Sequence, residues 1–396
     1  MAAILEGSHT QGHNEKLWEL VMKDFEQDYE SEEVLEKLND PDFFRPFSER
    51  LLAFYNEATN CSFTVDEARA DLQRRAKDAN IDLKRGAINN WFSGSTEPKY
   101  GDDDRRRMFA VAFALELDVE QTMCFFHKVF LDRAFNLRSD REFVYLHCIF
   151  NKKSFSVADA LIQRLGASKD SVVNTEHTEH TQLLVTVAGQ DIDENELLEF
   201  IAAHPYNFSL RNTAAKKHRS RLLEALTSGS KGRDGLAKQE YERRRSELAD
   251  SKDAYGFDGK DVKSVDFLLF MIMGVDFAKK GTAEIRSIRD KFHRKEVYNQ
   301  FPDKQTISME NPSSYILRKD IILLYFYEYW VNDYLSGQNR GDYDGFVDGL
   351  NDVLFDCGFS PLYIGNPYDW LFLFCSACAA DDYTPLDRFR GILGQV

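Results

Sequence analysis

The stretch LKRGAINNWFSG, residues 83–94, decides how the rest of this sequence is interpreted. Its apolar residues follow the spacing of a short helix, and residues three and four positions apart share one face of a helix. A helix over residues 84–92 would therefore bury one side of the stretch in a core. The residues on that side are Ile88, Trp91 and Phe92.

The opposite face of the same helix would carry Arg85, Asn89 and Asn90. In the major groove, arginine grips guanine and asparagine grips adenine, each through two hydrogen bonds. Cations beside such a helix are suited to the flanking phosphates. The sequence therefore predicts contacts with duplex DNA. The candidate residues are Lys84, Arg85, Asn89, Asn90, Ser93, Lys99, Arg105, Arg106 and Arg107.

Over residues 71–119 the chain resembles the Cro/C1-type helix-turn-helix family. Leu83 and Ile88 stand five apart, as do the first core residue after the turn and the core residue of the recognition helix in that family. Residues 91–98 match its W-x-x-G-x-x-x-P ending, in which glycine stops the helix and proline shapes the exit. Residues 109–119 are similar to its closing helix. The resemblance implies a DNA-binding domain.

Two departures from the family pattern keep a second hypothesis open. The segment from Ala76 to Leu83 is about two residues longer than the pattern, and Lys84 stands where the family has a Ser or Thr cap. Acidic residues 102–104 also lie beside the predicted contacts. The alternative is a non-enzymatic protein-interaction scaffold, or an accessory subunit of a bacterial assembly, with a repurposed helix-turn-helix.

Composition and charge limit both hypotheses. A chain of 396 residues, 43% of them hydrophobic, is too long for one ordinary core and predicts two or three domains. The net charge of −16 repels phosphates, so any DNA contact must be local. Residues 211–245 are basic, whereas residues 341–387 contain no Lys or Arg. We interpret the basic segment as a solvated helix face and linker, with a phosphate-contact strip as the alternative.

Helix-start signals recur along the chain and predict an all-α, multi-helical fold. Residues 64–67 and 139–142 fit the capping box, and residues 156–159 are a third such start. Residues 183–187 are the one strand-like run, and without a partner they are interpreted as a strand or a connector. The expected domains are an N-terminal helical segment (1–40), the helix-turn-helix domain (41–132), a middle helical domain (133–226), a basic, flexible connector (227–260) and an acidic, aromatic-rich C-terminal helical domain (261–396).

Neither cysteine nor histidine spacing predicts a metal site or a cofactor. Cys375 and Cys378 form a C-x-x-C pair, but no second pair stands at zinc spacing, and their apolar neighbours indicate core. His177 and His180 lie in a polar stretch without apolar periodicity, which favours a solvated loop.

The acidic C-terminal region carries three further patterns. The opening Asp342-Tyr343-Asp344-Gly345 is typical of a calcium loop, but the following residues do not fit one. Asp348, Asp352 and Asp356 lie on one helical stripe, either solvated or docked to a basic partner such as residues 211–245. The aromatic clusters at residues 325–330 and 368–372 must pack against neighbouring helices or against a second subunit, so a homodimer is expected.

Motif searches give no support for catalysis. The chain has no G-x-S-x-G, no Gly-rich phosphate loop and no H-E-x-x-H, so we predict that it is not an enzyme. Its apolar runs are too short to span a membrane, and no secretory signal opens it, so a cytoplasmic location is expected. The leading hypothesis is a sequence-specific, double-stranded-DNA-binding transcription regulator. Its C-terminal helical region would serve dimerisation or the binding of a partner or signal.

Overall fold

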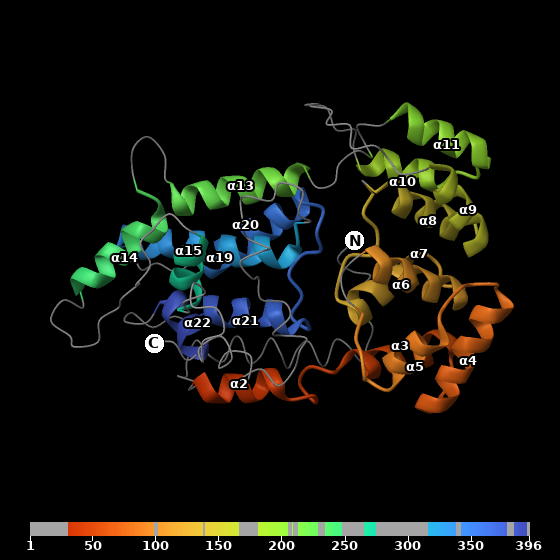
Figure 1. Ribbon diagram of the computed structural model, residues 1–396, viewed down its shortest axis with the longest axis horizontal. Coiled ribbons are helices and arrows are strands. Elements are labelled where there is room, and N and C mark those ends of the chain that lie inside the picture. Colours follow the sequence, from red (N-terminus) through yellow and green to blue (C-terminus); the bar gives the residue numbers. More distant parts are fainter. Residues whose placement is uncertain are drawn as a thin grey trace. The chain divides into compact units, whose positions relative to one another are not determined.

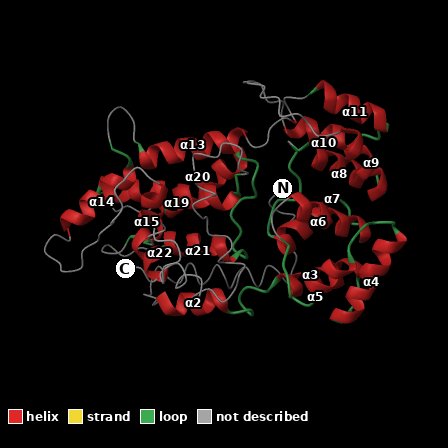
Figure 2. Ribbon diagram, in the orientation of Figure 1, coloured by secondary structure: helices red, strands yellow, loops and turns green. Residues whose placement is uncertain are grey.

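The computed structural model is built from helices and contains no strand in the part of the chain that it describes (Figure 1) (Figure 2). This confirms the predicted all-α class. The described residues are 31–98, 102–137, 139–165, 181–204, 208, 213–228, 234–247, 265–274, 316–337, 342–377 and 384–393. No helix among them is long and apolar enough to cross a membrane.

The described helices form two compact units that differ from the predicted domains. Unit 1 runs from residue 45 to residue 208, and unit 2 joins residues 31–44 to residues 213–393. The helices on either side of residue 132, where we expected a boundary, share the core of unit 1. The described residues of the predicted N-terminal segment (31–40) and of the predicted connector (227–228 and 234–247) belong to unit 2.

Unit 1 consists of α3 (Phe47–Thr59), α4 (Val65–Asp78), α5 (Arg85–Phe92), α6 (Asp102–Ala114), α7 (Val119–Phe125), α8 (Asp140–Phe150), α9 (Phe155–Leu165), α10 (Thr181–Gly189) and α11 (Glu194–Ala203). A π-helical turn, η2 (Phe126–Phe130), extends α7. Aromatic rings fill the centre of the unit, where Phe109 lies 4.6 Å from both Phe126 and Tyr145 between ring centroids.

The helix starts were predicted correctly where a cap is local. Thr64 accepts a hydrogen bond from the backbone of Glu67, whose carboxylate accepts one from the Thr64 backbone, so α4 begins with a complete capping box. Ser139 caps α8, but the carboxylate of Glu142 is bound elsewhere. The start predicted at Ser156 lies slightly earlier, because α9 begins at Phe155.

The strand-like interpretation of residues 183–187 is wrong, because these residues lie inside α10. Leu184 and Ala188, four positions apart, are buried, whereas Val185 is 38% exposed. That spacing of buried residues follows a helical rather than an alternating period. Tertiary packing has therefore overridden the β preference of the valines.

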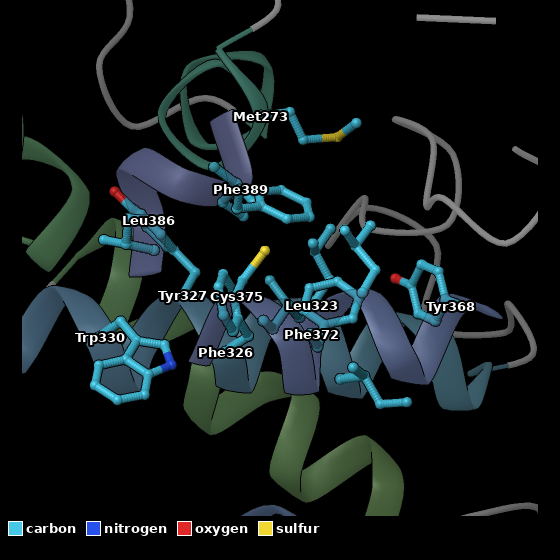
Figure 3. Packing of buried hydrophobic residues seen from close by; sticks show 14 of the residues in the cluster. Met273, Leu323, Phe326, Tyr327, Trp330, Tyr368, Phe372, Cys375, Leu386 and Phe389 are labelled. Carbon is cyan, nitrogen blue, oxygen red and sulfur yellow. The ribbon is translucent and has the colours of Figure 1, made fainter. Parts of the chain in front are cut away.

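Unit 2 consists of α2 (Ser31–Asn39), α13 (Thr213–Thr227), α14 (Leu236–Glu247), α15 (Val265–Met273), α19 (Arg318–Ser336), α20 (Tyr343–Asp356), α21 (Pro367–Ser376) and α22 (Pro385–Leu393). Its core brings α19, α21 and α22 together through Phe326, Phe372 and Phe389, whose ring centroids lie 4.9–5.4 Å apart (Figure 3). Both predicted aromatic clusters pack here, and Cys375 is buried among them as expected. Cys378 lies outside the described residues.

The connector predicted at residues 227–260 contains α14, which a buried charge ties to the core of unit 2. Glu240 is fully buried and accepts hydrogen bonds from both terminal nitrogens of Arg390, at 2.9 and 3.1 Å, and from Tyr327 at 2.6 Å. Burial opposes ionisation of Glu240, but Arg390 and Arg244 hold its pKa below the ordinary value. Arg244 of this segment pairs with Glu240 and Asp387, so this one of its cations stabilises the packing of unit 2.

Candidate nucleic-acid interface

Helices α4 and α5 follow one another through a tight turn at residues 79–84. Asn80 adopts a left-handed conformation with φ of 54°, which reverses the chain at the end of α4. The Ile81 amide then donates to the Ala76 carbonyl at 2.8 Å. Lys84 is the extended N-cap of α5, and its side chain makes no capping hydrogen bond. The helix predicted at residues 84–92 is confirmed to within one residue.

The inner face of α5 is anchored as the sequence predicts. Ile88, Trp91 and Phe92 are each at most 3% exposed. Trp91 and Phe92 make edge-to-face contacts with Phe47 and Tyr55 of α3, at ring-centroid distances of 6.4 and 6.1 Å. Buried aromatic pairs of this kind fix the orientation of the helix on the unit. The outer face of α5 is thereby held at the surface.

The outer face presents polar groups, most of which have no partner within the described chain. Lys84, Arg85 and Asn90 are exposed, and their side chains make no hydrogen bond or ion pair with any described residue. Asn89 is half-buried, and its side-chain oxygen accepts a hydrogen bond from Gln73 of α4 at 2.8 Å. Asn89 therefore differs from its neighbours in being held across the two helices.

The end of α5 is formed by Ser93 and Gly94. Ser93 is exposed, and its hydroxyl lies 3.2 Å from the Asn90 carbonyl and 2.7 Å from the Ser95 hydroxyl. Gly94 has φ of +68°, and a Cβ there would lie 3.3 Å from the Ser48 hydroxyl. Glycine is thus needed at this C-terminus, as predicted. Lys99, another predicted DNA contact, lies outside the described residues.

The prediction that Arg105 contacts phosphate needs correction, because its side chain is only 6% exposed. Its guanidinium binds Glu142 through two hydrogen bonds of 2.7 and 2.8 Å, and Asp132 through one of 2.6 Å. It also donates to the carbonyls of Arg133 and Ala134, each at 3.0 Å. These five bonds use all five N–H groups of the guanidinium. Arg105 is a structural residue that joins α6 to α8.

Arg106 and Arg107 remain partly exposed but are bound inside unit 1. Arg106 lies 2.5 Å from Asp159 of α9 and sits over the ring of Phe155. Arg107 lies 2.7 Å from Asp104 one turn earlier in α6. The structure therefore does not gather the three arginines with the outer face of α5. Two of the arginines, Arg105 and Arg106, are neutralised by acidic residues that lie tens of positions away from them in the sequence.

A second network that sequence reasoning missed joins α3 to α4 around Asp71. The Asp71 carboxylate accepts hydrogen bonds from Tyr55 and from Arg75, both at 2.7 Å, and also from Arg74. Burial opposes its ionisation, but the bonds from Arg75, Tyr55 and Arg74 together lower its pKa to about 2. Burial and the neighbouring carboxylate raise the pKa of Tyr55.

An open groove of about 520 Å³ lies between the end of α4 and the start of α5. Its apolar residues are Ala76 and Ile81, which are buried, and Leu83, which is half-buried. Its polar lining includes Lys77, which like Arg85 is exposed and makes no ion pair with a described residue. The full lining is Gln73, Ala76, Lys77, Asn80, Ile81, Asp82, Leu83 and Arg85.

Several residues of the other predicted sites make contacts within unit 2. Asp342, from the rejected calcium pattern, caps α20 by accepting a hydrogen bond from the Gly345 amide at 2.9 Å. In the basic segment, Arg221 binds Glu328 at 2.9 Å, and His218 lies 3.4 Å from Asp356 of the acidic stripe. His177 and His180 lie outside the described residues. Within the described chain, no three His, Cys, Asp or Glu side chains are grouped to hold a metal ion.

Comparisons with protein-family models, with characterised proteins and with solved structures found no match for this chain. The candidate function therefore comes from the surface of α4 and α5.

Proposed function

We propose that this chain is a cytoplasmic, sequence-specific, double-stranded-DNA-binding transcription regulator that reads bases with the outer face of α5. The observation that carries this proposal is the set of unpaired donors on that face. Arg85 and Asn90 are exposed and bound to no other described group. These are the side-chain types that recognise guanine and adenine through paired hydrogen bonds in the major groove.

The rigidity of α5 supports the same function. Its inner face is anchored by Ile88, Trp91 and Phe92, so the helix does not have to fold or reorient on binding. Gln73 holds Asn89 in one place on the outer face. A surface that is ordered before binding spends less of its interaction energy on ordering side chains. The reading groups are thus presented at low entropic cost.

Phosphate contacts at this surface are few, which gives the proposal a quantitative signature. Among the described residues, the exposed, unpaired cations around the outer face are Lys77, Lys84 and Arg85. Because Arg85 is assigned to a base, Lys77 and Lys84 are left for phosphates. Two phosphate contacts predict a slope of about −2 for log affinity against log salt concentration per protomer, since each contact contributes about −0.9. Contacts from Arg105, Arg106 and Arg107 as well would steepen that slope to about −4.5.

Unit 2 supplies the second part of the proposed function, dimerisation or the binding of a partner or signal. It has its own extensive aromatic core and its own buried charges. A unit with its own core can have a separate function in the same chain and does not have to contact the bases. We assign it no catalytic role.

A second candidate function, a protein-interaction scaffold with a repurposed α4–α5 pair, is favoured by the electrostatics. Several arginines of unit 1 are already paired with acidic side chains of the same unit. These are Arg69, Arg74, Arg75, Arg106 and Arg107. The chain as a whole carries a net charge of −16. A protein partner would tolerate that charge better than a polyanion does.

The deciding experiment is selection of bound duplexes from random-sequence and genomic DNA with the full chain, at low and physiological salt. We would compare the wild type with an Arg85→Ala/Asn90→Ala variant and with Arg141→Ala. Arg141 is exposed in the same unit and makes no ion pair with a described residue, so it is a control for charge. The regulator is supported if the wild type and the control select one sequence and the double variant does not.

Failure takes two distinct forms in this experiment. If none of the proteins binds duplex DNA at low salt, the regulator is wrong and the scaffold becomes the leading function. If the double variant selects the same sequence as the wild type, DNA binding is real but α5 does not read the bases. The salt slope then shows how many cations elsewhere make the contacts.

A further inference from the structure

Phe355, on α20 of unit 2, is an exposed aromatic residue that nothing in the proposed function uses. Its exposure is 77%, whereas the other exposed large apolar side chains of the described chain are at most 40% exposed. The residues beside it on the helix, Asp352 and Asp356, are also exposed. Removing such an apolar ring from water is favourable, so Phe355 is suited to a contact with a partner.

The surroundings of Phe355 are strongly negative. Asp344, Asp348 and Asp352 are exposed at intervals of one helical turn, and none of them is ion-paired with a described residue. Asp356 has one potential cationic partner, His218, at 3.4 Å. Phe355 also lies in the last turn of α20, where the helix dipole adds negative potential. A complementary partner must therefore be apolar at its centre and basic at its rim.

The groove between α4 and α5 in unit 1 has this character. Its apolar residues are Ala76, Ile81 and Leu83, and its cations are Lys77 and Arg85. Both cations are exposed and free of ion pairs with described residues. Asp82 is the one acidic residue in the lining of this groove. The groove, at about 520 Å³, is large enough to admit one aromatic side chain.

We propose that Phe355 of one copy of this chain docks into the α4–α5 groove of a second copy. Asp352 and Asp356 then face Lys77 and Arg85. An aromatic side chain in a small pocket with a charged rim is the usual form of an interface hot spot. Each copy carries both halves of the contact, so two copies joined reciprocally close into a dimer with two identical contacts.

The docked state has a consequence for DNA. Arg85 lines the groove and also belongs to the proposed reading face, so the two ligands compete for it. This consequence rests on the proposed function, whereas the docking itself does not. Self-association and DNA binding are measured separately below, so either can fail without the other.

The test is sedimentation velocity of the full chain over the widest concentration range that its solubility allows. We would compare the wild type with Phe355→Ser and with Lys77→Glu/Arg85→Glu. Every substituted side chain is exposed, so no buried contact is lost, and circular dichroism checks that each variant is folded. Met123→Ser is the control, because Met123 is an exposed apolar residue of another helix, α7. We expect the wild type and the control to associate as concentration rises and the other two to stay monomeric.

A mixture of the two monomeric variants identifies the pairing. Phe355→Ser retains the groove, and Lys77→Glu/Arg85→Glu retains Phe355, so one of the two contacts can form between them. We expect the mixture to associate, more weakly than the wild type, although neither variant does so alone. The proposal is overturned if the wild type is monomeric throughout, if either variant associates like the wild type, or if the mixture remains monomeric.

A DNA titration of the wild type at concentrations above and below its self-association range then tests the competition. Duplex selected by the wild type should dissociate the dimer. If the dimer persists when DNA is saturating, DNA and the second copy do not compete for Arg85. Absence of DNA binding with intact self-association would reject the proposed function alone.

Discussion

Replacement of Arg105 by alanine should destabilise unit 1, although the sequence places this residue among surface arginines. The substitution leaves the carboxylates of Asp132 and Glu142 without their cation and the carbonyls of Arg133 and Ala134 without a donor. Removing one partner of a buried ion pair costs about 3–5 kcal/mol. The two carboxylates keep side-chain exposures of 16% and 13%, so water offsets part of this cost. We therefore expect a loss of about 3 kcal/mol.

The assay is hydrogen exchange of the α6 and α8 amides in the full chain as urea is raised, which follows unit 1 separately from unit 2. Arg107→Ala is the matched control, because Arg107 is 41% exposed and pairs with Asp104 on its own helix. Such a pair is worth less than about 1 kcal/mol. Equal effects of the two substitutions would refute the assignment of Arg105 as a buried structural residue. A triple variant, Arg105→Met/Asp132→Asn/Glu142→Gln, should recover part of the loss by removing the stranded charges.

Three further predictions concern the α4–α5 region. Thr64→Ala removes the capping box of α4 and should cost about 1 kcal/mol in urea unfolding, and an unchanged midpoint would show that the cap is dispensable. The pKa of Asp71 is about 2, below its ordinary value. Its ionised form therefore stabilises the fold above about pH 4, and this contribution is lost as the pH falls toward 2. With Asp71→Asn, the free energy of unfolding should fall less steeply between about pH 4 and pH 2 than it does in the wild type. An equally steep fall in both proteins would contradict the low pKa of Asp71. Gly94→Ala forces an alanine into a left-handed conformation and should raise the free energy of that site by about 1–2 kcal/mol. Gly86→Ala, with open space around its Cβ, should not destabilise the protein, and similar losses for both would refute the conformational argument.

Local features of the fold were predictable from the sequence because their causes are local. The helix around Ile88 follows from apolar spacing, its end at Gly94 from a backbone conformation, and the start of α4 from Thr64 and Glu67. Each of these signals lies within a few residues of its effect. Residues 183–187 were predicted wrongly, because the burial of Leu184 and Ala188 depends on other helices.

The candidate site was predictable only in part, because exposure and pairing are tertiary properties. The sequence identifies Arg105, Arg106 and Arg107 as equivalent cations. Their different surroundings come from Glu142, Asp132 and Asp159, which no spacing rule connects with them. From the sequence, Gln73 is only a polar residue in a predicted helix. Its hydrogen bond to Asn89 depends on how α4 packs against α5.

Unit 2 is built from two separate segments of the chain, and this affects the order in which the protein can fold during synthesis. Helix α2 belongs to unit 2 and packs against α22, while the described residues of unit 1 lie between them in the chain. Domains generally fold as they are synthesised, N-terminal parts first. Val34 and Leu38 of α2 are buried in the core of unit 2, so that core can be completed around them only after α22 has emerged. Unit 1 can be complete before then, so a chaperone that protects nascent apolar segments is expected to act on α2 rather than on unit 1.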